Sequence, residues 1–184
     1  MVQITQENNN SRRKKRVAVL IVSGILLVII LPFIAVIFSI STENLFNIPK
    51  LIPIPFNFII GLILLPIGFY WSLWSNIALY KIGNGTPVPL KDTQTTKLVI
   101  IGPYKYSRNP MIFGYLLLWF GLGFIFNSII LLFGFTISIT VGLILFVKLW
   151  EENNLEKRFG NSYLNYKESV SFIIPLPRAK DKTE

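Results

Sequence analysis

Long uncharged stretches alternate with short charged segments along this 184-residue chain. Residues 17–40 carry no charge, and roughly 20 apolar residues in a helix are enough to cross the hydrocarbon core of a bilayer. Residues 51–80 are also uncharged, with prolines at the start and aromatic residues at the end. Interfacial aromatic residues are typical of span ends. The pattern predicts a first span within 17–40 and a second from about Pro55 to residue 80.

A third uncharged stretch separates Arg108 from Lys148. As a single helix it would be about twice as long as a bilayer core is thick, so it favours two spans. The polar break near its middle is Asn127-Ser128. We therefore predict a helical hairpin that turns there, with a third span over about 110–126 and a fourth over about 129–149.

The segment after Lys148 is amphipathic. Apolar and aromatic residues recur every three or four positions, which places them on one face of a helix: Leu155, Phe159, Tyr163, Tyr166 and Val170. We predict that this face lies along the membrane surface. Gly160 is expected to divide the segment into two short helices, and Ser162 to cap the second.

Composition and charge agree with an all-α integral membrane protein. Hydrophobic residues make up 52% of the chain, and 18 Lys and Arg outnumber 9 Asp and Glu. The basic residues cluster in "SRRKKR" near the N-terminus and in the 81–109 loop, and basic loops are retained in the cytoplasm. We expect four spans with both termini cytoplasmic. Because the basic blocks flank apolar stretches, we do not expect nucleic-acid binding.

The expected parts of the chain follow from these spans. They are a basic cytoplasmic tail (1–16), two N-terminal spans (17–80), a core that includes the hairpin (81–175) and a C-terminal tail (176–184).

The residue types restrict the chemistry that this chain can perform. It contains no Cys and no His, which excludes thiolate nucleophiles, imidazole bases and the common zinc sites. The hairpin should bring "GPYKYSRNPMIFGY" (102–115) beside Glu151 and Glu152, because the cytoplasmic ends of its two spans must be neighbours. One interpretation is that the glutamates are solvated and pair with Arg108 or Lys148. The other is a functional site for a cationic ligand.

Two segments together resemble the isoprenylcysteine carboxyl methyltransferase family and its prokaryotic members, which are related to phospholipid N-methyltransferases. The segments are "LVIIGPYKYSRNPMIFG" (98–114) and "EENNLEKRFGNSYLNYKESV" (151–170). The resemblance covers roughly residues 80–175. It implies that 81–175 forms a methyltransferase core that binds S-adenosyl-L-methionine.

The resemblance implies a cofactor site built from both segments. The implied cofactor-binding residues are Lys97, Leu98, Val99, Tyr104, Arg108, Asn109, Pro110, Met111, Ile112, Glu151 and Glu152. Lys148 is the implied substrate-binding residue, and no metal is implied. Carboxylates and tyrosine faces suit the sulfonium and ammonium of the cofactor, and Arg108 would suit its carboxylate.

The chain departs from the resembled family at two positions. Asn109 stands where the eukaryotic enzymes have histidine, so hydrogen bonding is retained while imidazole chemistry is lost. The arginine that those enzymes use for the substrate aligns with Val147, and Lys148 is only adjacent. A "GNG" at 83–85 is similar to a phospholipid methyltransferase motif, although a lone pattern of this kind is common in loops.

The predicted function is methyl transfer from S-adenosylmethionine to a lipophilic acceptor in the membrane. The first candidate acceptor is the carboxylate of an isoprenylcysteine-like or other lipid-borne group, and the expected partners are a lipid or lipidated substrate and the bilayer. Three alternatives stay open: a phospholipid or amine N-methyltransferase, a nicotinamide-dependent reductase similar to sterol reductases, and a non-catalytic membrane subunit.

Overall fold

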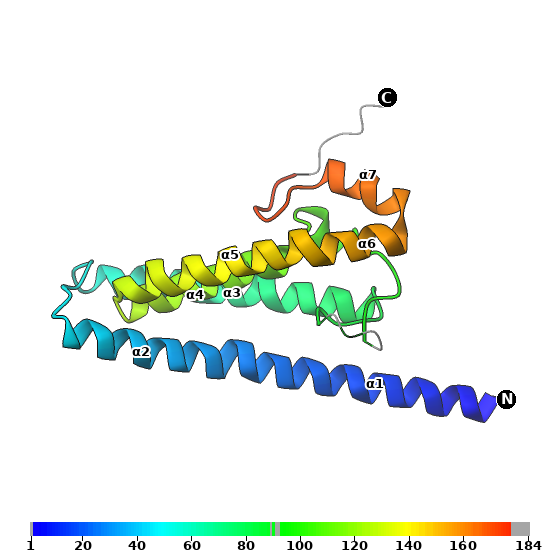
Figure 1. The fold of residues 1–184 in the computed structure, drawn as a ribbon, viewed down its shortest axis with the longest axis horizontal. Helices are drawn as coiled ribbons and strands as arrows, with labels where there is room; N and C mark the ends of the chain where they lie inside the picture. The colour runs from blue at the N-terminus through cyan, green and yellow to red at the C-terminus, as the bar shows by residue number, and fades with distance from the viewer. Residues whose placement is uncertain (1, 89, 91–92, 178–184) are drawn as a thin grey trace.

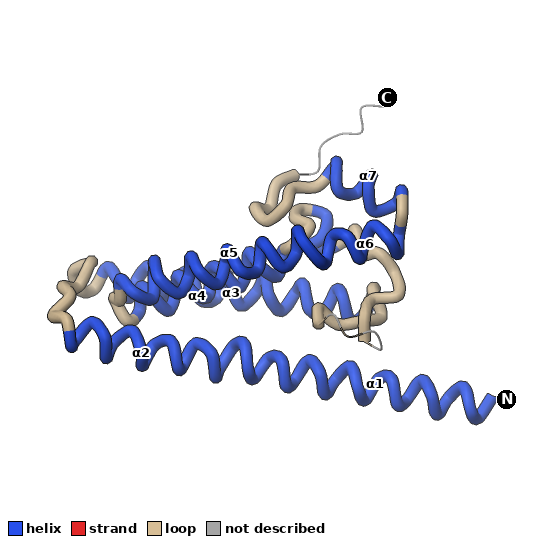
Figure 2. The backbone as a smooth tube through the Cα atoms, in the orientation of Figure 1, coloured by secondary structure: helices blue, strands red, loops and turns tan. Residues whose placement is uncertain are grey.

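The computed structural model describes residues 2–88, 90 and 93–177, and this part of the chain is helical without strands (Figures 1 and 2). The first three elements form one long rod: α1 (Val2–Gly24), the π-helical turn η1 (Ile25–Ile30) and α2 (Leu31–Leu45). A basic tail was predicted over 1–16. From Val2 onward this segment is helical and continues into the first span. The tail predicted over 176–184 lies outside the described residues from residue 178 onward.

The remaining helices form the body of the molecule. They are α3 (Phe56–Lys81), the 3₁₀ turn η2 (Gly102–Lys105), α4 (Pro110–Ile125), η3 (Ile130–Phe135), α5 (Thr136–Phe146), η4 (Val147–Glu151), α6 (Glu152–Phe159) and α7 (Asn161–Ser169). Figure 1 shows that η3 through α6 continue as one second rod. Both rods and α3 therefore run the length of the molecule.

Among the described residues, three helical segments are long and apolar enough to cross a membrane: Asn10–Leu45, Phe56–Lys81 and Ile130–Phe159. A fourth apolar helix, α4, has 16 residues. The predicted hairpin between α4 and the second rod is confirmed. Asn127 adopts a positive φ of 48°, and the Ser128 amide donates to the Gly123 carbonyl over 3.0 Å, which reverses the chain direction.

Helices α3 and α4 approach each other closely because glycines face each other across their contact. A Cβ at Gly68 would lie 2.7 Å from the Gly114 carbonyl oxygen, and a Cβ at Gly61 would lie 2.9 Å from the Gly121 carbonyl oxygen. Small residues allow this approach in membranes, where helix association depends on close packing. The glycines thus hold α4 against α3.

The apolar face of the amphipathic tail packs against the body of the molecule, and its position along a membrane surface stays a prediction. Helix α6 continues the line of α5, and Gly160 (φ 52°) then turns the chain so that α7 folds back. Tyr163, Tyr166 and Val170 are buried against Leu98. The predicted division at Gly160 is confirmed. Ser162 does not cap α7, because Gly160 occupies the N-cap and no side-chain hydrogen bond caps this helix.

The first rod is held to the body at the hairpin end by a buried carboxylate. Glu43 is 2% exposed and accepts hydrogen bonds from the Ser128 hydroxyl (2.6 Å) and the Ile130 amide (3.0 Å). Lys50 lies 3.3 Å from its other oxygen. Hydrogen bonds to a charged acceptor are strong, and here they join α2 to the start of η3.

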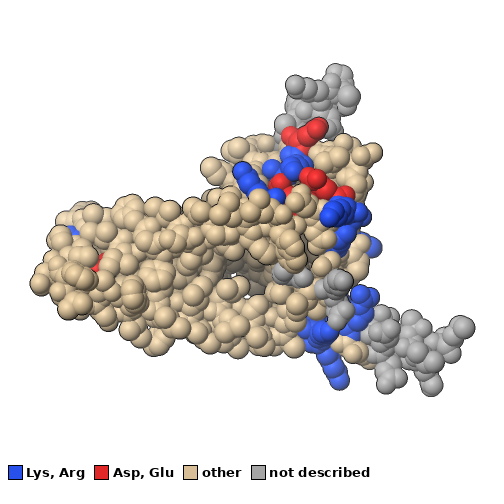
Figure 3. Space-filling view, viewed as in Figure 1, with Lys and Arg blue, Asp and Glu red and all other residues tan. Residues whose placement is uncertain are grey.

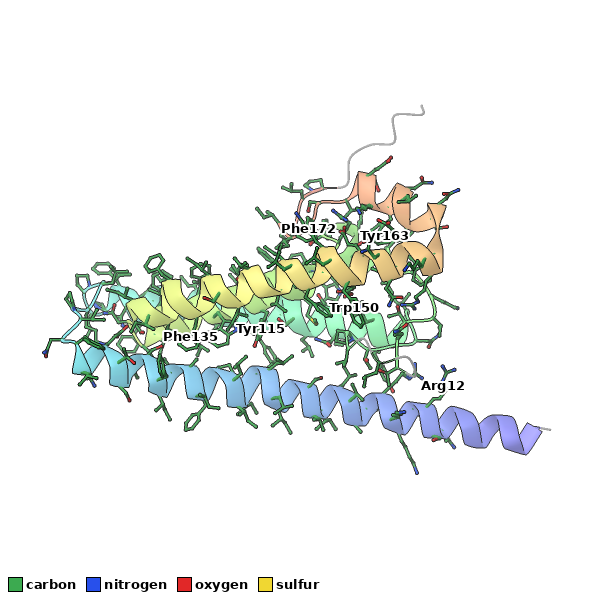
Figure 4. All side chains as sticks on the ribbon, viewed as in Figure 1. Arg12, Tyr115, Phe135, Trp150, Tyr163 and Phe172 are labelled. Atoms are coloured by element: carbon green, nitrogen blue, oxygen red, sulfur yellow. The ribbon has the colours of Figure 1, made fainter. Side chains whose placement is uncertain are left out.

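A second attachment lies in the middle of the rod, at η1. The Leu31 amide donates to the Leu26 carbonyl, five residues back, as in a π-helix. In the same π-helical pattern the N–H of residue 32 would donate to the Leu27 carbonyl. Residue 32 is a proline, which has no N–H. The Tyr115 hydroxyl of α4 donates to the Leu27 carbonyl instead, over 2.6 Å. Figure 4 shows Tyr115 reaching from the body toward the rod.

This attachment predicts the effect of removing the Tyr115 hydroxyl. Tyr115→Phe should lower the free energy of unfolding by about 0.5–2 kcal/mol, because the Leu27 carbonyl then lacks a donor in an apolar setting. The measurement is the melting temperature of the purified protein in detergent. Tyr70→Phe is the control, since Tyr70 is 58% exposed and its hydroxyl bonds no described residue. Equal melting temperatures for the two variants would contradict the role of Tyr115.

Candidate functional site

A cavity of about 1230 Å³ lies between the first rod and the body of the molecule. The α1–η1 part of the rod forms one wall, and α3, α4 and α5 form the others. Figure 3 shows the hollow between the two parts. Most of the lining is apolar. Its polar end is built from the 94–99 loop, residues 104–109 and α6.

Nine of the residues implied by the resemblance line this cavity: Lys97, Leu98, Val99, Tyr104, Arg108, Asn109, Met111, Ile112 and Glu151. Three do not. Pro110 is fully buried in the first turn of α4, Glu152 points away into an ion-pair cluster, and Lys148 is exposed on the outside with its ammonium 5.2 Å from the centre of the Phe172 ring.

The loop segments 83–88 and 93–99 contribute residues to the cavity lining. Asn84 has a positive φ of 52°, and a Cβ on Gly85 would lie 2.3 Å from the Thr95 amide nitrogen. The Thr96 amide donates to the Gly83 carbonyl over 2.7 Å. The "GNG" stretch is therefore a tight turn whose glycines let 94–97 pack directly against it.

Glu151 brings a carboxylate to the cavity wall without a direct partner. It has no hydrogen bond and no ion pair with any residue that the structure describes, and the charged groups that act on it electrostatically are Glu152 and Arg158. Tyr104 lies close to it, and burial followed by the Glu151 charge raises the pKa of the Tyr104 phenol well above its usual range. The phenol is therefore neutral at physiological pH.

Glu152, the neighbouring carboxylate, has two partners. It lies 2.5 Å from the Arg108 guanidinium and 2.9 Å from the Lys167 ammonium, and Lys167 also pairs with Glu156 over 2.8 Å. The Glu152 and Arg108 side chains are 9% and 13% exposed. The interpretation that the glutamates pair with Arg108 thus holds for Glu152 and does not hold for Glu151. Arg108 is engaged with a protein carboxylate.

The segment after α7 fixes the start of α4. The amides of Arg108 and Asn109 donate to the carbonyls of Ser171 (2.8 Å) and Phe172 (3.1 Å). The Asn109 side-chain amide donates to the same Phe172 carbonyl over 2.9 Å. The hydrogen-bonding capacity that asparagine keeps in place of histidine is used here to hold the chain at the cavity edge.

The family model of phospholipid methyltransferases matches residues 56–162. The chain belongs to the phospholipid methyltransferase family. No curated protein and no solved structure matches it. The matched range spans α3, the 82–109 loop, α4 and the second rod, so it contains the cavity wall from Lys97 to Arg158. This is the family named in the sequence analysis as related to the isoprenylcysteine carboxyl methyltransferases, and the match does not extend to membership of the latter.

Among the polar lining residues that sequence reasoning did not identify are Arg158 and Asn154 of α6. Arg158 lines the cavity, interacts with the Glu151 charge and donates hydrogen bonds to the backbone carbonyl and side chain of Thr95. Asn154 lines the cavity one turn before it. Both follow from helical spacing, since residues three and seven positions after Glu151 lie on the same helix face.

Tyr163 was predicted only as part of the apolar stripe, yet it lines the cavity of this family member as well. Burial, followed by the Glu152 charge, raises the pKa of its phenol to about 12. Figure 4 labels Tyr163 and Phe172 at the same end of the molecule. The polar end therefore contains the Glu151 carboxylate, which has no hydrogen bond to a described residue, and neutral phenols.

Proposed function

We propose that this member of the phospholipid methyltransferase family is a membrane-embedded enzyme that uses S-adenosylmethionine to methylate a lipophilic acceptor. The observation that carries the proposal is the Glu151 carboxylate, which lines the cavity and forms no hydrogen bond or salt bridge with a described residue, although the Arg158 charge acts on it. A carboxylate near the membrane is costly without a cation or donor. Its surroundings therefore suit a cationic ligand.

The residues of the polar end fit that cofactor. S-adenosylmethionine, when bound, supplies a methyl group activated by a positively charged sulfur, and it also carries an ammonium. Glu151 would hold positive charge, Tyr104 would offer a neutral ring, and the backbone of 97–99 would bond the adenine edge. Arg158 would meet the cofactor's carboxylate in place of Arg108, which Glu152 already engages.

Catalysis by this chain would consist mainly of positioning. Methyl transfer is an in-line displacement, and fixing a nucleophile against an activated methyl supplies much of the rate acceleration. The apolar walls of the cavity exclude water, while the segment 171–172 keeps residues 108–109 at its edge. No side chain of the polar end needs to act as a nucleophile itself.

The geometry favours an amine as the acceptor over the carboxylate of an isoprenylcysteine-like group. A carboxylate substrate would need Lys81 or Lys97 as its cation, because Val147, 3% exposed, replaces the expected arginine and Lys148 lies outside the cavity. Arg108 is neutralised by Glu152. A lipid-borne amine needs no cation. An ammonium headgroup would lose a proton to water or to a carboxylate before its nitrogen attacks the methyl carbon.

The acceptor is tested with the full chain in nanodiscs and methyl-tritiated S-adenosylmethionine. We expect label to enter phosphatidylethanolamine and not N-acetyl-farnesylcysteine. Label only in N-acetyl-farnesylcysteine would show that the acceptor is a carboxylate and not an amine. Absence of label from both, together with absence of S-adenosylhomocysteine binding by calorimetry, would refute the enzyme proposal.

The role of Glu151 is tested by Glu151→Gln. Removing the charge should weaken binding of S-adenosylhomocysteine, which retains the ammonium, by roughly ten- to a hundredfold, with little change in melting temperature. Glu152→Gln should instead lower the melting temperature, because it leaves Arg108 without its partner. Glu156→Gln removes a surface pair whose side chains are 35% and 34% exposed, and it should change both values little. Equal affinities for all three variants would remove Glu151 from the site.

We also propose four membrane spans with both termini in the cytoplasm. Figure 1 places the start of α1 and helix α7 at the same end of the molecule, which an even number of crossings requires. Figure 3 shows most of the charged side chains gathered at that end. Because basic segments stay cytoplasmic, the cavity's polar end would face the cytoplasm, where the soluble cofactor is available.

This topology is measured with reporter fusions at the C-terminus and in the 46–55 loop. The C-terminal fusion should report the cytoplasm and the loop fusion the outside. An external C-terminus would exclude four spans with a cytoplasmic N-terminus.

A further inference from the structure

The glycines of the helices differ in what a side chain at each position would meet. At Gly61, Gly68 and Gly114, between α3 and α4, an added Cβ would lie less than 3.0 Å from atoms of the facing helix. These glycines are needed for packing. At Gly24 of α1 and Gly142 of α5, an added Cβ would meet nothing within 4 Å.

Gly24 and Gly142 both line the cavity, and they do so from opposite walls. A glycine inside a helix costs roughly 0.5–1 kcal/mol relative to alanine, so it needs a compensating reason. Close helix packing is the usual reason in membranes. It does not apply to Gly24 and Gly142, because no atom would lie within 4 Å of an added Cβ. What the two positions share is the open space of the cavity beside them.

We propose that Gly24 and Gly142 set the width of the apolar part of the cavity, and that they thereby select the hydrocarbon chain of the methyl acceptor. The inference rests on the proposed function for the identity of the acceptor as a lipid. The chain would run between Leu27 on the rod and Leu143 on α5, with its polar group at the Glu151 end.

A hydrocarbon chain is the occupant that this part of the cavity fits. The apolar walls offer water few hydrogen-bond partners, so the space is unsuited to water or to a polar ligand. The apolar part is continuous with the polar end, which is where a headgroup attached to the same chain would lie. At about 1230 Å³ the cavity also exceeds the usual range for one drug-sized ligand, about 300–1,000 Å³, as expected for a site that holds a cofactor and a lipid together.

The test uses the full chain in phosphatidylcholine nanodiscs with a phosphatidylethanolamine that carries a diazirine at the end of either a palmitoyl or an octanoyl chain. After illumination, mass spectrometry measures the label on peptides from α1 and α5. In Gly24→Leu and Gly142→Leu, palmitoyl labelling should fall at least about fivefold, because the leucine occupies the space of the chain. Octanoyl labelling should be reduced less.

Gly134→Leu is the matched control on the same rod. Gly134 does not line the cavity, and a Cβ there meets only Ile130, at an ordinary 3.6 Å. Its labelling should stay within about twofold of the wild type. Gly142→Ala adds one methyl and should give an intermediate palmitoyl signal, which keeps the test valid if a leucine variant does not fold.

Palmitoyl labelling that is equal in the wild type, Gly142→Leu and Gly142→Ala would overturn the inference. Affinity for S-adenosylhomocysteine, measured in parallel, separates this failure from a failure of the proposed function. If the wild type does not bind S-adenosylhomocysteine but the leucines still reduce labelling, the cavity selects chains and the methyltransferase proposal fails. If binding is retained and labelling is unchanged, only the role of the glycines fails.

Discussion

The ion pair between Arg108 and Glu152 determines the arrangement of the polar end. Adjacent residues on a helix point about 100° apart, so two consecutive glutamates cannot face the same partner. Because Arg108 and Lys167 hold Glu152 on one side, Glu151 is turned into the cavity. The same pair joins the start of α4 to α6, and Lys167 adds α7. A buried pair of this kind costs desolvation and stabilises little in net terms, but it specifies geometry.

Much of the fold could be predicted from the sequence because a bilayer imposes strong constraints. Uncharged stretches of a fixed minimum length indicated the spans, and the Asn127-Ser128 break indicated the hairpin. The amphipathic tail shows where such reasoning stops. Its spacing correctly placed Tyr163 and Tyr166 on one face, but a pattern does not specify what covers that face. In the structure the cover is the 98–109 segment, since the Tyr166 hydroxyl donates to the Tyr104 carbonyl over 2.8 Å.

For the candidate site, the sequence predicted which residues take part better than it predicted how they are arranged. The resemblance named the residues that line the polar end, yet which glutamate would be paired depends on the rotation of α6, which the sequence pattern does not contain. The apolar part of the cavity was not predictable at all. It exists because the first rod stands away from α5, which depends on tertiary contacts such as the bond from Tyr115 to Leu27.

The first rod is attached to the body at three levels. Near the hairpin, the Glu43 carboxylate accepts hydrogen bonds from Ser128 and Ile130, in the middle the Tyr115 hydroxyl donates to the Leu27 carbonyl, and toward the N-terminus the Arg16 guanidinium lies 5.5 Å from the Tyr80 ring centre. These partners belong to three different parts of the body: the hairpin, α4 and α3. Moving the rod away from the body along its whole length would therefore require breaking contacts with all three, so the cavity wall that the rod provides is a built part of the fold.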